Sequence, residues 1–183
     1  MIRKKGKIYS RTPIVLAVLL LALFGLIQGV LGAGIDPNDR WAWSTSAGWI
    51  NFAPQCTGCD GVAVYSDHLE GYAWGEHIGW IRVGSHDGGG AHTYANTAAD
   101  NYGVNNDGAG HLSGYAWGTN VGWLNFDPAG SEGVTIDPAS GEFDGYAWGE
   151  NIGWIHFRGT GYVEYGVSLL IHHFYLPLVL RNG

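Results

Sequence analysis

The chain has 183 residues, of which 31 are glycine, 14% are aromatic and 14% are charged, and its formal net charge is −7. This composition excludes a disordered chain, which would be charged and poor in aromatic residues, and it favours a turn-rich β protein. After residue 33 there are four arginines, no lysine and sixteen acidic residues, a balance of −12. Such an acidic surface repels nucleic acid, so no nucleic-acid partner is expected.

The first 33 residues have the pattern of an export segment. Five of the nine basic residues lie within the first eleven positions, and an apolar stretch from Pro13 to Ala33 follows them. A basic start before an apolar run that ends in small residues predicts a signal peptide. The run is also near the length that spans a bilayer, so an uncleaved N-terminal anchor helix is the alternative. We expect a secreted or cell-surface protein that touches a membrane only through residues 1–33.

An aromatic hairpin of the form G-Y-A-W-G-x-N-I-G-W-I-x-F occurs four times. The copies align without gaps over Arg40–Phe52, Gly71–Val83, Gly114–Phe126 and Gly145–Phe157. Their first tryptophans are Trp43, Trp74, Trp117 and Trp148, at spacings of 31, 43 and 31 residues. The longer middle spacing indicates an insertion, which we place within Gly84–Tyr102. Repetition of this kind is typical of folds in which each unit buries its apolar face against the next.

Three copies are preceded by another strand-like piece, which begins with Gly-Val at Gly61, Gly103 and Gly133. Turn-forming runs such as Asp137–Gly141 separate this piece from the hairpin. Each unit is therefore predicted to be a three-stranded β-meander of about 31 residues, the repeat spacing. The predicted units are 36–52, 61–83, 102–126 and 133–157.

A two-residue turn at Glu150–Asn151 is the register we expect for the last hairpin. It sets Trp148 opposite Gly153 and Trp154 opposite Ala147, so that each large ring lies over a small residue. The two faces of this sheet would carry the following residues: Tyr146, Trp148, Ile155 and Phe157 on one, and Phe143, Ile152 and Trp154 on the other. Since both faces are apolar, the sheets must stack against one another.

The predicted fold class is all-β, as a domain over residues 34–170. The first unit lacks a Gly-Val strand, and a spare strand candidate lies at 161–167. If that strand joins the first unit, the four units form a closed, propeller- or prism-like ring without exposed edges. An open β-hairpin solenoid is the alternative, and residues 171–183 are expected to be a C-terminal tail.

The hairpin tryptophans and tyrosines have two interpretations. Exposed rings would provide stacking platforms for sugars or a cage for a cation, whereas buried rings would pack between stacked sheets. Recurrence at a fixed register favours packing. The candidate ligand-binding residues are Trp74, Trp80, Trp117, Trp123, Trp148 and Trp154, and the structural repeat residues are Tyr72, Tyr115, Tyr146, Gly79, Gly122 and Gly153.

Cys56 and Cys59 are expected to form a small disulfide in an oxidising compartment, with free thiols or a metal or redox role as alternatives. Acidic turn residues such as Asp107 and Asp137 are read as turn formers, with Ca²⁺ binding the only cofactor considered. His86 and His92 lie in the Gly-rich insertion, which would have to be ordered before they bound a metal. No metal site is therefore assigned.

The four hairpins resemble the Y-A-W-G-E-N-I-G-W-I-x-F repeats of bacterial secreted and cell-surface proteins, over roughly residues 36–157. They are more loosely similar to choline-binding hairpin repeats, although the interval and the three-strand unit differ. The resemblance implies a bacterial, extracytoplasmic protein whose repeats bind or display something. It implies no ligand residues for this chain.

No nucleophile, metalloprotease or phosphate-loop motif occurs in the sequence, and no catalytic residue is assigned. We expect a non-catalytic repeat module that has a structural or interaction role at the cell surface, with a surface protein or a glycan as partner. The alternatives are a lectin-like module that binds a carbohydrate or small ligand through hairpin aromatics, and an enzyme accessory domain.

Overall fold

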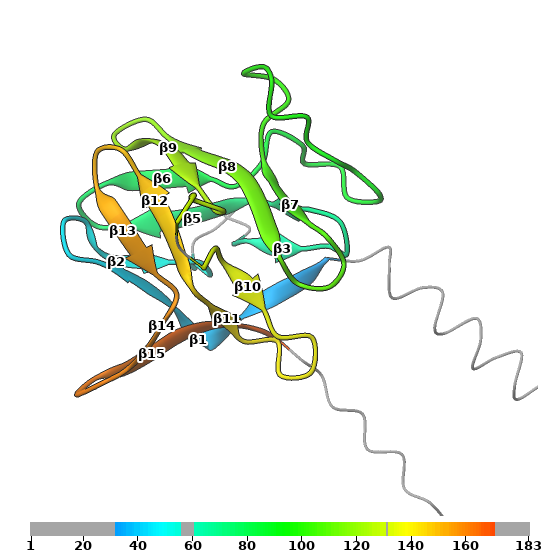
Figure 1. Ribbon diagram of the computed structural model, residues 1–183. Coiled ribbons are helices and arrows are strands. Elements are labelled where there is room, and N and C mark those ends of the chain that lie inside the picture. Colours follow the sequence, from blue (N-terminus) through cyan, green and yellow to red (C-terminus); the bar gives the residue numbers. More distant parts are fainter. Residues whose placement is uncertain (1–31, 56–60, 131, 171–183) are drawn as a thin grey trace, which may run out of the picture.

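The computed structural model describes residues 32–55, 61–130 and 132–170, and the regular structure of these residues is β-strand (Figure 1). The predicted all-β class is confirmed. No helix in the described part of the chain is long and apolar enough to cross a membrane. Residues 1–31 of the predicted signal or anchor, both cysteines and the tail at 171–183 lie outside the described residues.

Eight antiparallel strands form a closed barrel, and they follow one another round it in the order in which the chain makes them. This is the arrangement of an up-and-down barrel. The barrel closes where Trp43 pairs with His156 and Ser44 pairs with Ile155. Its strands are β1 (Ala33–Ser44), β2 (Gly48–Asn51), β5 (Tyr72–Gly75), β6 (Gly79–Arg82), β8 (Leu112–Gly118), β9 (Gly122–Asn125), β12 (Tyr146–Gly149) and β13 (Gly153–His156).

The ring is closed as predicted, and the open solenoid is wrong. The propeller- or prism-like arrangement of separate sheets is also wrong, because neighbouring hairpins pair through their backbones. Gly149 of β12, for example, lies opposite Leu124 of β9. The four hairpins therefore make one continuous sheet, in which no barrel strand is an edge.

Shorter hairpins form a second, more loosely linked ring at one end of the barrel (Figure 1). They are built from β3 (Ala63–Val64), β4 (Leu69–Glu70), β7 (Val104–Asn106), β10 (Thr135–Ile136), β11 (Phe143–Asp144), β14 (Arg158–Thr160) and β15 (Glu164–Leu169). β3 pairs with β4 and with the start of β1, and β7 pairs with the start of β8. Isolated bridges join the hairpins at His68–Asn105, His111–Thr135 and Glu142–Ser168. The third unit is the predicted three-stranded meander, formed by β7, β8 and β9. In the second and fourth units the middle strand is divided at Gly71 and Gly145, so that one piece belongs to each ring.

The C-terminal segment completes this second ring. β15 pairs with β1, with Arg40 opposite Val167 and Ile35 opposite Leu169. The spare strand predicted at 161–167 therefore joins the first unit, although its first three residues form the bend between β14 and β15. Closure of the barrel itself comes from β13.

The hairpin register differs from the predicted one by one residue. Gly149 pairs with Gly153 and Trp148 pairs with Trp154, so the turn holds three residues instead of two. The Ile152 N–H donates to the Gly149 carbonyl at 3.3 Å, and Gly153 follows with a φ of 69°. This is a tight turn closed by a residue in the left-handed region, a conformation that glycine adopts without strain. Since a one-residue shift moves every side chain of one strand to the opposite face relative to its partner strand, the predicted face assignment is wrong. Trp154 shares a face with Trp148, and Ile155 shares the other with Ala147.

The barrel interior alternates small and large side chains. Alanine on the first strand of each hairpin lies opposite an aliphatic residue on the second, as Ala147 lies opposite Ile155. These pairs are fully or almost fully buried: Ala42 with Ile50, Ala73 with Ile81, Ala116 with Leu124, and Ala147 with Ile155. Phe157 packs against Phe52 and Phe126 in the layer toward the second ring, with ring centroids 5.1 Å and 5.7 Å apart. An eight-stranded barrel is just wide enough to be filled in this way.

The far end of the barrel is closed by a residue from each hairpin turn. A Cβ on Gly118 would lie 2.7 Å from Val121 Cγ2, and a Cβ on Gly149 would lie 2.9 Å from Ile152 Cγ1. The first hairpin has Ser44 at the glycine position and Ala47 at the apolar turn position. Its Ser44 hydroxyl donates to the Ile152 carbonyl at 3.0 Å. A larger strand residue is therefore matched by a smaller turn residue.

This match predicts coupling between Gly75 and Ile78, the corresponding pair of the second hairpin. Gly75→Ser alone should lower the free energy of unfolding by about 1–3 kcal/mol, because the new side chain overpacks the barrel end. Ile78→Ala alone should cost about 2–5 kcal/mol, because it leaves a cavity. The double variant recreates the first hairpin and should cost less than the sum, by about 0.5–3 kcal/mol. Urea unfolding of all four proteins measures the difference, and additive costs would contradict the account.

Closure by β15 makes a second prediction. Val167 is fully buried, and the nearby turn residue Val163 is 58% exposed. Val167→Ala should lower the stability of the whole domain by about 1.5 kcal/mol, for the loss of two buried methyl groups. Val163→Ala should stay within about 0.5 kcal/mol of the parent chain. If Val167→Ala left the tryptophan-monitored transition unchanged, β15 would not belong to the cooperative unit.

Candidate ligand-binding surface

The outer face of the barrel carries an aromatic belt, which consists of three rings from each hairpin. Ten of its twelve side chains are between 37% and 44% exposed, while Trp41 and Trp43 are half-buried. The interpretation of these rings as packing between sheets is wrong, because the three-residue turn places them all outside. The belt consists of Trp41, Trp43, Trp49, Tyr72, Trp74, Trp80, Tyr115, Trp117, Trp123, Tyr146, Trp148 and Trp154.

The rings of each hairpin hold one another in place. The two tryptophans of a hairpin lie with centroids 4.7–4.9 Å apart and planes tilted by 57–67°. The third ring lies 6.0–6.4 Å from the second tryptophan, nearly perpendicular to it. Tilted and edge-to-face contacts are favourable for aromatic rings. The belt is thus a set of positioned, solvent-facing rings, and ordering them on binding costs little entropy.

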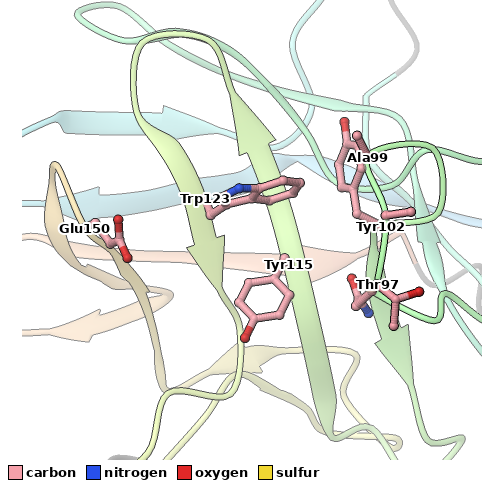
Figure 2. A pocket seen from close by; sticks show the side chains of 8 residues that line it. Thr97, Ala99, Tyr102, Tyr115, Trp123 and Glu150 are labelled. Atoms are coloured by element: carbon pink, nitrogen blue, oxygen red, sulfur yellow. The ribbon is translucent and has the colours of Figure 1, made fainter.

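The insertion makes a groove beside the ring set of the third hairpin. Tyr102 comes from the end of the insertion and packs edge-to-face on Trp123, at 5.0 Å. Tyr165 packs edge-to-face on Trp49 of the first set in a similar way, at 5.1 Å, but without an insertion beside it. The groove encloses about 480 Å³. Figure 2 shows Tyr115 and Trp123 between Tyr102 and Thr97 on one side and Glu150 of the fourth hairpin tip on the other. Burial raises the pKa of the Tyr102 hydroxyl above its usual range.

The insertion is anchored by a buried tyrosine. Tyr94 is 2% exposed, and its hydroxyl donates to the Leu69 carbonyl at 2.9 Å. Its ring occupies the space in which Gly84 and Gly103 lack side chains. The Tyr94 N–H donates to the side-chain oxygen of Asn105, whose amide donates back to the Tyr94 carbonyl. This Gly-rich segment is therefore held against the second ring, which meets the ordering requirement set out from the sequence.

A cluster of histidines and carboxylates lies under the same insertion. His68 is fully buried, with Nδ1 2.6 Å from Asp67 Oδ1 and Nε2 2.9 Å from Glu70 Oε1. Burial would raise the pKa of Asp67, but the hydrogen bonds with His68 and the His92 N–H lower it overall. The pKa of His92 is lowered by burial and by the neighbouring His86 and His68. Ligand atoms of His68, Glu70 and His86 all lie within 4.8 Å of one another.

The structure brings together only part of what the sequence singled out. Trp123 lines the groove, whereas Trp74, Trp80, Trp117, Trp148 and Trp154 are exposed elsewhere on the belt. Gly79, Gly122 and Gly153 end the hairpin turns, with φ of 69–74°.

The disulfide predicted between Cys56 and Cys59 lies outside the described residues.

Turn acids have their oxygens engaged locally. Asp107 Oδ1 accepts the N–H groups of Ala109 and His111, and Asp137 Oδ1 accepts those of Ala139 and Ser140. These bonds are those of side chains that form turns. This agrees with their interpretation as turn formers, and calcium binding stays an untested alternative.

Tyr102, His68 and Glu70 are site residues that the sequence analysis did not select. His68 lies in an isolated bridge directly before β4, and Glu70 lies in β4, two residues further along. In extended backbone that spacing places both side chains on the same face. This signal was present in the sequence. His86 and His92 lie close to His68 because the insertion folds back over it. A local sequence pattern does not predict that path.

Comparisons of this chain with protein-family models, with curated proteins and with solved structures found no match. Its class is therefore defined by its own geometry, as a closed β-barrel that carries a solvent-facing aromatic belt.

The position of the belt can be tested by fluorescence, since all nine tryptophans belong to it. A neutral quencher such as acrylamide should quench most of the native fluorescence, because seven of the nine tryptophans are 37–44% exposed. Stern–Volmer titration with and without denaturant measures this. Strong protection in the native state, lost on unfolding, would contradict the outward placement.

Proposed function

We propose that this protein is a non-catalytic, lectin-like binding module that holds a neutral carbohydrate in the groove between the insertion and the third hairpin. The observation that carries the proposal is the exposure of Trp123 and Tyr115 beside Tyr102, in a groove of about 480 Å³. This volume lies within the range of small-ligand sites, roughly 300–1,000 Å³. Pre-positioned rings with polar groups at the rim suit a ligand that has both apolar faces and hydroxyls.

The polar rim and the charge narrow the ligand class. Thr97 and Glu150 are exposed at the groove and can exchange hydrogen bonds with sugar hydroxyls. The acidic charge of the chain disfavours anionic ligands. A quaternary ammonium ion could also lie against aromatic rings, but the open groove is larger than a compact cage around one cation.

Location at a bacterial cell surface or outside the cell belongs to the same proposal. It is supported by the export pattern of residues 1–33 and suits the recognition of a glycan. In this proposal the barrel holds the aromatic rings in fixed positions for binding. The insertion forms one wall of a groove beside the third hairpin.

A glycan panel followed by fluorescence titration tests the proposal. Trp123→Ala should weaken binding of the neutral glycan by about tenfold or more, as expected for an aromatic anchor. Trp154→Ala is the matched control, since it removes the same repeat position outside the groove and should leave the affinity within about twofold, or ~0.4 kcal/mol. Binding of choline instead of any glycan, equal losses for both variants, or turnover of a glycan would overturn the proposal.

A further inference from the structure

The buried cluster under the insertion has an electrostatic feature that the groove does not explain. Both ring nitrogens of the fully buried His68 lie within hydrogen-bonding distance of a carboxylate oxygen, 2.6 Å from Asp67 and 2.9 Å from Glu70. A neutral imidazole has one N–H donor and one lone pair. One of the two contacts therefore joins a lone pair to a carboxylate, unless a positive charge lies between them.

Two arrangements supply that charge. A further proton can lie between the ring and one carboxyl group, either as an imidazolium between two carboxylates or as a protonated acid that donates to a neutral ring. Alternatively, a metal ion can bind Nε2 and Glu70 while Nδ1–H donates to Asp67. The second arrangement is the carboxylate–histidine–metal triad, in which the non-ligating nitrogen of a histidine donates to an acid.

We propose that His68, Glu70 and His86 bind a divalent transition-metal ion of the zinc class. Histidine nitrogens and a carboxylate oxygen are ligands that zinc accepts, and ligands about 2.0–2.1 Å from the ion on a tetrahedron lie roughly 3.3 Å apart. Glu70 Oε1 lies 2.9 Å from His68 Nε2 and 3.6 Å from His86 Nε2, on either side of that value.

The two histidines are the wider pair, within 4.8 Å of each other. His86 is the half-buried member, on the insertion, and its Nε2 also lies 3.2 Å from the Gly89 carbonyl. If the His86 ring moves slightly toward His68, its Nε2 leaves the Gly89 carbonyl and binds the metal ion instead. Asp67 and the Gly89 N–H, which donates to Glu70 Oε1 at 2.9 Å, orient the ligands from behind.

Of the three proposed ligands, His86 lines a hollow that opens to solvent, whereas His68 and Glu70 are buried. His86 and His92 line a hollow of about 440 Å³ that also includes Asp100 and Ser85. The His92 ring is stacked on His86 with centroids 4.2 Å apart. Three protein ligands with an opening to solvent leave one coordination position for water or for a ligand from outside.

Metal binding by the full chain tests this site independently of glycan binding. The chain should carry Cys56→Ser and Cys59→Ser, so that no thiol contributes. Equilibrium dialysis against Zn²⁺ should give one tightly held ion per chain, and Co²⁺ should give the intense visible absorption of a tetrahedral site. Asp67→Asn should weaken Zn²⁺ binding by about 10- to 100-fold, the usual effect of losing such a partner.

His86→Ala should lose the bound ion, and His111→Ala is the matched control. His111 is exposed and pairs with Asp107 outside the cluster, so its removal should leave the affinity unchanged. Absence of a stoichiometric ion, binding that requires the cysteines, or equal effects of the two histidine variants would overturn the proposal and support the protonated arrangement. Should His86→Ala fold poorly, the Co²⁺ spectrum of the parent chain still decides.

Discussion

The left-handed glycine that ends each hairpin turn is the constraint on which this structure depends. Gly48, Gly79, Gly122 and Gly153 have φ of 69–74°, a conformation that other residues adopt only with strain. This conformation closes a three-residue turn, and the turn determines which residues face each other across the hairpin. Alanine and isoleucine then point inward and both tryptophans point outward. A two-residue turn would have placed the two tryptophans of a hairpin on opposite faces of the sheet.

The inner face explains why four similar hairpins can close. Each hairpin contributes one small and one aliphatic side chain to a barrel of fixed diameter, and each turn contributes one residue that closes the end. Ser44 and Ala47 show that a larger strand residue is accompanied by a smaller turn residue when the members of this pair change. The second ring adds phenylalanines below the barrel and uses β15 to complete the first unit. Because β1 takes part in both rings, it pairs with β13 in the barrel and with β15 in the second ring, and so connects the two ends of the described chain.

Much of this architecture could be predicted from the sequence. The repeats, the all-β class, the closure and the joining of residues near 161–167 to the first unit follow from alignment and from the missing strand. The register could not be predicted, because Glu150 and Asn151 suit a two-residue turn as well as the first part of a three-residue turn. That one-residue difference reversed the inferred role of every belt tryptophan. The histidine cluster was missed because its members come from β4 and from an insertion whose path depends on where Tyr94 packs.

Function is best sought where the fourfold pattern is broken. Large aromatic rings exposed on a whole belt are a liability for solubility unless they serve binding, since contiguous apolar surface promotes association. The barrel does not need these rings for its core, which is filled by alanine, aliphatic residues and phenylalanine. The insertion lies beside only one ring set, where it adds Tyr102, and its anchoring by Tyr94 also orders the segment that holds His86. The groove and the histidine cluster therefore share one structural support, so an ion bound at the cluster would stabilise the same backbone that forms one wall of the groove.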